Sequence, residues 1–234
     1  MPDTAHVPAD LATTIAALRE ELAGLEDERI RAVNAKRGDD HAVNLTALRA
    51  IAKRVKKQPE LARALWDEPA EDSTPRLLSL LISRPSQYGP EELDRMLREA
   101  ATPKVHDWLV GYVVKMSPHR EALREAWFAD ADPAVASAGW ALTSDRVVKK
   151  PEGIDQSALL DLIEARMQSA PERLQWAMKE CLAQIGITNP ALRERARDIG
   201  ERLEVLKDYP TPPNCTSPFA PVWIDEMVRR AEAR

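Results

Sequence analysis

Prolines divide this chain into short segments that repeat a helical pattern, and this limits what it can fold into. Apolar residues recur every three or four positions, as in Leu45, Leu48 and Ile51, and alternating strand patterns are absent. Several of the 18 prolines stand where a helix should begin, where the missing N–H has no helical partner anyway. We expect an all-α fold. The expected helices are 10–34, 44–57, 60–67, 74–83, 90–100, 103–116, 118–129, 133–148, 156–169, 171–186, 190–205 and 219–232.

The expected helix starts recur at a nearly constant distance. Segments begin at Pro59, Pro90, Pro118, Gln156 and Pro190, which are 31, 28, 38 and 34 residues apart. This is the length of a helix pair, and short connections make the two helices of a pair antiparallel. The pattern predicts an α-solenoid of antiparallel helix pairs.

We expect a single repeat domain over 1–234. It would have an N-terminal helical cap at 1–34, helical repeats at 35–206, and a Pro-rich loop with a C-terminal capping helix at 207–234. An apolar helix follows the loop, which favours an ordered loop over a disordered linker. Cys215 in this loop is predicted to be a buried structural thiol rather than a nucleophile.

Composition excludes several classes of protein. The net charge is −5, from 33 basic and 38 acidic residues, and no apolar run approaches the roughly 20 residues of a membrane span. Residues 1–20 do not resemble a secretory signal, and two cysteines cannot make a disulfide framework. We therefore expect a cytoplasmic protein that does not bind membranes.

The charge is unevenly distributed, which bears on nucleic acid as a partner. Residues 31–66 hold nine basic and three acidic residues, a net charge of +6. This stretch is either a solvated helix face or an anion-binding face that would make affinity salt-dependent. The basic residues between positions 49 and 57 are Arg49, Lys53, Arg54, Lys56 and Lys57.

Tryptophans also recur with the repeat. Trp108, Trp140 and Trp176 each lie in the second helix of a pair, 32 and 36 residues apart. They are either packing anchors between repeats or an aromatic row along a groove that contacts a ligand. Trp66 and Trp127 lie late in amphipathic helices and are predicted to belong to the core.

Helical spacing places polar side chains beside this row. A groove with inward-pointing aromatic and basic side chains would suit a phosphate–sugar backbone, although a mixed surface with ordinary ion pairs fits the same pattern. The side chains expected in the groove are Trp108, Tyr112, Lys115, Trp140, Arg173, Trp176 and Lys179.

General catalytic motifs are missing from the sequence. It has no glycine-rich phosphate loop, no paired Cys-x-x-Cys and no His-Glu-x-x-His, and its four histidines are scattered. We expect no metal and no cofactor. The run Asp39-Asp40-His41 after Gly38 is predicted to be a turn that caps the next helix.

Four segments in order carry a family resemblance. They are Gly38 to Lys53, Val105-His106-Asp107-Trp108, Leu174 to Glu180, and Asn214 to Pro218 followed by Trp223. From about residue 30 to its end, the chain resembles the DNA alkylation repair proteins, which are HEAT-like-repeat DNA glycosylases.

The resemblance implies a C-shaped solenoid that holds duplex DNA in a basic concave groove. Active members excise positively charged N3- or N7-alkylated purines by hydrolysis of the N-glycosidic bond, without metal. Two tryptophans and an aspartate contact the deoxyribose of the damaged nucleotide, and an arginine holds a phosphate. Trp108 and Trp176 match the two tryptophans.

Two family positions are changed in this chain. The catalytic aspartate would lie four residues after the first tryptophan, where this chain has Tyr112. The arginine pair would fall near Ala136 and Ser137. Asp107 and Glu180 are the remaining carboxylates that could act in catalysis.

Three hypotheses follow. The chain is a DNA-binding repeat protein with altered or absent glycosylase activity, an active glycosylase that uses Asp107 or Glu180, or a protein-binding scaffold. We expect a monomer whose partner is duplex DNA, possibly alkylated, with the DNA backbone following the helix at 49–57.

Overall fold

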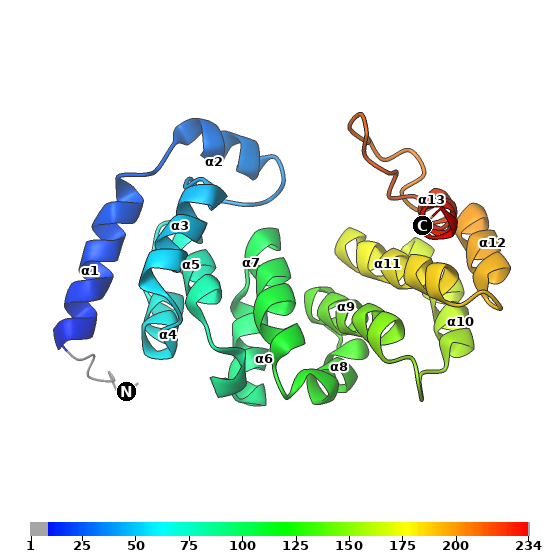
Figure 1. Cartoon of the computed structure of the whole chain (residues 1–234), viewed down its shortest axis with the longest axis horizontal. Coiled ribbons are helices and arrows are strands. Elements are labelled where there is room, and N and C mark those ends of the chain that lie inside the picture. Colours follow the sequence, from blue (N-terminus) through cyan, green and yellow to red (C-terminus); the bar gives the residue numbers. More distant parts are fainter. Residues whose placement is uncertain (1–8, 234) are drawn as a thin grey trace. The chain divides into compact units, whose positions relative to one another are not determined.

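The computed structural model describes residues 9–233, which divide between two compact units, unit 1 up to His119 and unit 2 from Arg120 onward. Helices form both units (Figure 1), and within the described range the β pairing is one isolated bridge between Glu26 and Val43. The expectation of an all-α fold is confirmed. None of the described helices is long and apolar enough to cross a membrane.

Unit 1 stacks helix pairs on a central helix, α5. Helix α5 packs against α3, α4 and α7, and its residues Leu77, Leu78 and Leu80 are buried. Helix α7 continues through a π-helical turn, η2 (Leu109–Val113), into a 3₁₀ turn, η3 (Val114–Met116). The α-helices are α1 (Ala9–Ala23), α2 (Glu28–Ala35), α3 (Leu45–Val55), α4 (Pro59–Asp67), α5 (Thr74–Ile82), α6 (Pro90–Glu99) and α7 (Pro103–Trp108), with a 3₁₀ turn, η1, at Pro85–Gln87.

Unit 2 is organised around α11, which packs against α9, α10, α12 and α13. Gly186 of α11 lies so close to α13 that an added Cβ would come 2.6 Å from Ile224 Cδ1. The helices are α8 (Arg120–Phe128), α9 (Pro133–Lys149), α10 (Gln156–Arg166), α11 (Glu172–Thr188), α12 (Arg193–Leu203) and α13 (Ala220–Glu232), with a 3₁₀ turn, η4, at Met167–Ser169. Helices α8 and α9 form one pair, and α10 and α11 the next.

Some boundaries differ from the prediction. The single helix expected at 10–34 is two helices, because Asp27 caps α2 by accepting a hydrogen bond from the Arg29 N–H at 2.7 Å. The Asp27 N–H itself donates to the Ala42 carbonyl, which holds the break in place. Helix α12 begins at Arg193 rather than 190, since Asn189 accepts from the Ala191 N–H in a turn before it.

The turn at 38–41 caps different helices from the one predicted. Asn44 caps α3, by accepting from the Thr46 N–H. Buried Asp39 instead accepts from the Lys104 N–H at 2.7 Å, in the first turn of α7. Asp40 accepts from the Ser73 N–H at 3.1 Å, just before α5. The turn therefore ties the start of α3 to the first turns of α5 and α7.

Core predictions hold for the tryptophans and fail for one cysteine. Trp66 and Trp127 are almost fully buried, as expected. Cys215 is exposed, which contradicts the prediction of a buried thiol, because residues 207–215 all lie at the surface. The buried thiol is Cys181 of α11, and burial raises its pKa to about 12.

Candidate functional site

An aromatic and cationic cluster connects α3 to α7 in unit 1. The Arg49 guanidinium carbon lies 5.1 Å from the centroid of the Trp108 ring, a cation–π contact. Tyr112 meets Trp108 edge-on, with centroids 5.3 Å apart and planes at 69°. We call Arg49, Trp108 and Tyr112 the aromatic cluster. Trp108 is nearly buried and Tyr112 is exposed, so the cluster joins the core of unit 1 to its surface.

A row of cations extends from this cluster along α3. Arg49 and Lys53 are four residues apart, which places them on one side of the helix, and Lys56 follows directly after it as the C-cap residue, with a φ of 66°. All three are exposed, while Leu48 and Ile51 on the opposite side of α3 are buried. We call these three residues the basic stripe. Within residues 9–233, the Lys53 and Lys56 ammonium groups have no hydrogen-bond or ion-pair partner, so their charge is available to an anionic ligand.

The two other basic residues predicted on this helix do not join the stripe. Arg54 Nη1 donates to Glu21 Oε1 of α1 at 2.9 Å, and this guanidinium lowers the pKa of Glu21. Lys57 Nζ donates to the Leu81 carbonyl at 2.9 Å, and burial lowers the pKa of Lys57. The charge of Arg54 is therefore neutralised, and the Lys57 ammonium is engaged with a backbone carbonyl.

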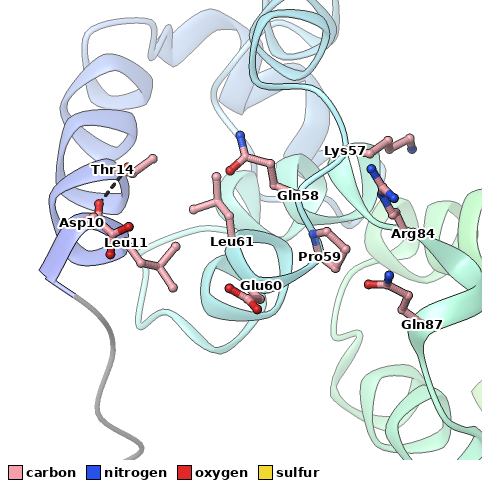
Figure 2. Close-up of a pocket in the computed structure, with 10 residues that line it drawn as sticks. All are labelled: Asp10, Leu11, Thr14, Lys57, Gln58, Pro59, Glu60, Leu61, Arg84 and Gln87. Carbon is pink, nitrogen blue, oxygen red and sulfur yellow. Dashed lines mark hydrogen bonds between the residues drawn. The ribbon is translucent and has the colours of Figure 1, made fainter.

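Lys57 instead lines a pocket of about 510 Å³ between α1 and the start of α4 (Figure 2). Figure 2 shows Lys57 and Arg84 on one side and Asp10 on the other. Because the pocket carries charges of both signs and none of the aromatic cluster, we treat it as separate from the candidate site.

Unit 2 contains a second aromatic group, built around a buried lysine. Lys179 Nζ lies 4.9 Å from the Trp176 ring centroid and 4.5 Å from that of Trp223, so the ammonium is held between two indoles. Tyr209 meets Trp176 edge-on at 5.0 Å. Lys179 is only 4% exposed, and burial lowers its pKa to about 8. Lys179 is predicted from the sequence to contact DNA; in the structure its charge is enclosed between the two indoles, and the contact stays a prediction.

Trp140 also does not lie in the predicted aromatic row along a groove. It is buried, and its ring packs on Phe128 with centroids 4.6 Å apart. The neighbouring Gly139 explains this, because an added Cβ would come 2.5 Å from the Phe128 backbone nitrogen. Helices α8 and α9 approach each other closely at Gly139, and the Trp140 ring is buried. The ring is therefore not exposed to a ligand.

The remaining predicted residues are dispersed. Asp107 directs its carboxylate to solvent, with 70% of the side chain exposed, 3.4 Å from His106 Nδ1. Glu180 is exposed on α11, in the other unit. Lys115 and Arg173 are half-buried, in η3 and in the first turn of α11. Among the residues that the structure describes, no group of His, Cys, Asp and Glu side chains could hold a metal ion.

A basic pocket of about 210 Å³ between α8 and α9 was not predicted. Glu121 pairs with Arg124 at 2.8 Å and lies 3.6 Å from Arg146, which leaves excess positive charge around it. The net charge of residues 104–150 is close to zero, so charge counted by segment does not reveal this pocket. The sequence signal that could have revealed it is the presence of cations on both helices of one pair. Its basic residues are Arg120, Arg124, Arg146, Lys149 and Lys150.

Stacked antiparallel helix pairs in both units define a helical repeat protein. The sequence model of a family described as DNA alkylation repair enzymes matches residues 18–209. This match covers most of the chain, and the chain therefore belongs to that family.

A solved structure has the same fold, with a TM-score of 0.74 at 21% identity, over 92% of this chain and 94% of that one. It is described as a new family of proteins related to the HEAT-like repeat DNA glycosylases with affinity for branched DNA structures. The repeats are accordingly of the HEAT-like type. No curated protein matches the chain.

Proposed function

We propose that this chain is a DNA-binding member of the DNA alkylation repair family whose glycosylase activity is altered or absent. The observation that carries the proposal is the basic stripe beside the aromatic cluster. Lys53 and Lys56 have no partner within residues 9–233. Arg49 on the same helix lies over the Trp108 ring, and Trp108 contacts the exposed ring of Tyr112. Cations in a row neutralise phosphates, and an aromatic edge beside them can contact sugar or base.

The presence of tyrosine at position 112 supports altered glycosylase activity. The family resemblance places the catalytic carboxylate at this position, where it would stabilise the positive charge that develops on the sugar as the base leaves. A neutral phenol supplies no such charge, and the Asp107 carboxylate points to solvent. The structural relative described as having affinity for branched DNA supports binding as the main activity of a chain with this fold.

Excision of N3- or N7-alkylated purines is the second candidate. Membership of a family of repair enzymes favours it. It would require Asp107 or Glu180 to act as the carboxylate, and these belong to different units.

Fluorescence anisotropy with labelled duplex DNA tests the proposal. We expect binding at low salt that weakens steeply as sodium chloride is raised. Absence of binding at low salt would contradict every DNA-based function. Release of 7-methylguanine from methylated duplex tests the second candidate, with Asp107→Asn and Glu180→Gln as comparisons; equal release by wild type and both variants would exclude these carboxylates.

A further inference from the structure

The basic pocket between α8 and α9 carries more positive charge than its own acidic residues neutralise. Eight residues line it, five basic and two acidic, so the lining has a net charge of +3. Both acids are already engaged, because Glu121 pairs with Arg124 at 2.8 Å and Asp145 pairs with Lys149 Nζ at 2.9 Å. The remaining cations of the pocket are Arg120, Arg146 and Lys150.

One donor of Arg146 is buried without an acceptor. Arg146 Nη2 donates to the Glu152 carbonyl at 2.8 Å, and Nε lies 3.6 Å from Glu121 Oε2. Nη1 is buried and has no hydrogen-bond partner among the residues that the structure describes. A buried charged donor without an acceptor destabilises the fold. Because Arg146 lines the pocket, an oxygen bound there could accept from this nitrogen.

Two further cations lie at the ends of the same helices. Arg120 is the first residue of α8 and Lys150 directly follows α9, and both line the pocket. Both side chains are exposed, and within residues 9–233 neither makes a hydrogen bond or an ion pair. Like charges gathered in one pocket repel one another, and an anion bound among them removes that repulsion.

We propose that this pocket binds the dianionic phosphate group of a phosphate monoester. A terminal phosphate carries close to two negative charges and three acceptor oxygens. Arginine guanidinium groups bind such oxygens through two parallel N–H donors. Arg124 and Arg146 are half-buried, so water competes less for their donors than for those of an exposed arginine. The volume of about 210 Å³ is sufficient for such a group.

The lining favours the phosphate itself over a base or an internal strand phosphate. Among the residues that the structure describes, the lining holds no aromatic side chain on which a base could stack. An internal phosphate of a DNA strand is a diester with one negative charge, which matches a net charge of +3 less well. The ligand is therefore either the terminal phosphate of a nucleic-acid strand or a small free phosphate. The inference does not depend on the basic stripe, because the stripe belongs to unit 1 and the pocket to unit 2.

An NMR titration of the isotope-labelled full chain tests the site. Inorganic phosphate, added at an ionic strength held constant with sodium chloride, should produce saturable shifts in the amides of 120–124 and 145–150. Arg146→Lys keeps the charge but removes the guanidinium, and should weaken binding about tenfold. Arg120→Gln removes one exposed charge and should weaken binding by up to about fivefold. Arg166→Gln in α10 is the matched control, because Arg166 is an exposed arginine of unit 2 outside the pocket.

Several results would overturn the phosphate site. They are shifts that do not saturate, shifts that sodium acetate reproduces at the same concentrations, and affinities of Arg120→Gln and Arg146→Lys no weaker than that of Arg166→Gln. If Arg146→Lys does not fold, the comparison of Arg120→Gln with Arg166→Gln still decides. Failure of the wild type to bind duplex DNA, with phosphate binding intact, would contradict the proposed function and leave this inference standing.

Two further ligands identify the source of the phosphate. Tighter binding of a 5′-phosphorylated oligonucleotide than of adenosine monophosphate at these amides would assign the strand end, and equal or weaker binding would assign the free phosphate. The same oligonucleotide with a 5′-hydroxyl should not shift these amides. If it shifts them as strongly, the pocket binds diesters and the monoester assignment is wrong.

Discussion

Tyr112 lies edge-on against Trp108, 5.3 Å between ring centroids, at the position where the family resemblance places a catalytic aspartate. Restoring a carboxylate there should restore some excision, because a negative charge would face the sugar from which the cationic base departs. We expect Tyr112→Asp to release 7-methylguanine from methylated duplex faster than the wild type. Tyr112→Asn is the control, since it removes the ring without adding charge. Equal release by the two variants would show that position 112 is not the lost catalytic position.

The basic stripe gives a prediction about salt dependence. Each phosphate contact contributes about 0.9 to the slope of log affinity against log salt concentration. Lys53→Gln and Lys56→Gln should each reduce that slope by about 1, whatever the DNA sequence. Arg54→Gln should leave it nearly unchanged, because Arg54 is paired with Glu21. Anisotropy titrations over a range of salt concentrations measure the slope. An equal reduction in Arg54→Gln would contradict the assignment of Lys53 and Lys56, but not Arg54, to the DNA-binding surface.

Lys179 predicts a pH dependence of stability. Burial lowers its pKa from the ordinary 10.5 to about 8, so below pH 8 the folded protein carries a buried ammonium at a cost of about 3 kcal/mol before the cation–π contacts offset part of it. Between pH 8 and 10.5 the unfolded chain binds more protons than the folded one, and stability from this group rises with pH.

Substitution by methionine isolates this effect. Below pH 8 the Lys179→Met variant should exceed the wild type in free energy of unfolding by the largest amount. This difference should decrease as the pH approaches 10.5. Urea unfolding at several pH values measures the difference. Exposed Lys150→Met should show no such trend. A difference that is constant with pH for Lys179→Met would mean that the ammonium is not desolvated.

Two glycines give opposite predictions for the same substitution. A Cβ on Gly139 would come 2.5 Å from the Phe128 nitrogen and 2.6 Å from the Trp127 carbonyl carbon, both backbone atoms. Gly139→Ala should destabilise the protein by about 1–3 kcal/mol through overpacking between α8 and α9. Gly111→Ala meets no atom within 4 Å, and should stabilise by up to about 1 kcal/mol. Thermal unfolding of both variants measures the contrast, and similar shifts in both would contradict the close approach at Gly139.

Sequence periodicity was sufficient for the fold, because proline positions and apolar spacing are local signals. The starts of α4, α6 and α10 fall at Pro59, Pro90 and Gln156, as predicted. The partner of each side chain was not predictable in the same way. Lys179 and Lys53 are both lysines on amphipathic helices, yet one is enclosed by Trp223 from a helix more than 40 residues later in the chain and the other is open to solvent.

The same limit explains the errors in the site. Helical spacing placed Trp140 on the same face as its equivalents, but Gly139 allows α8 to approach and cover it. The π-helical turn at Leu109–Val113 departs from the regular helical spacing on which the prediction for Tyr112 rests, so the surroundings of Tyr112 come from the structure. The pairing of Arg54 with Glu21 depends on where α1 lies, which periodicity does not specify.

The contact of Asp39 with the Lys104 N–H spans 65 residues of chain. During synthesis the amino-terminal segment that carries the basic stripe leaves the ribosome long before α7 exists to receive it. A chain halted before residue 104 would display the cations of α3 without the aromatic ring that orients Arg49. Contacts of such long sequence separation form slowly, so this surface should acquire its final geometry only at the end of the folding of unit 1.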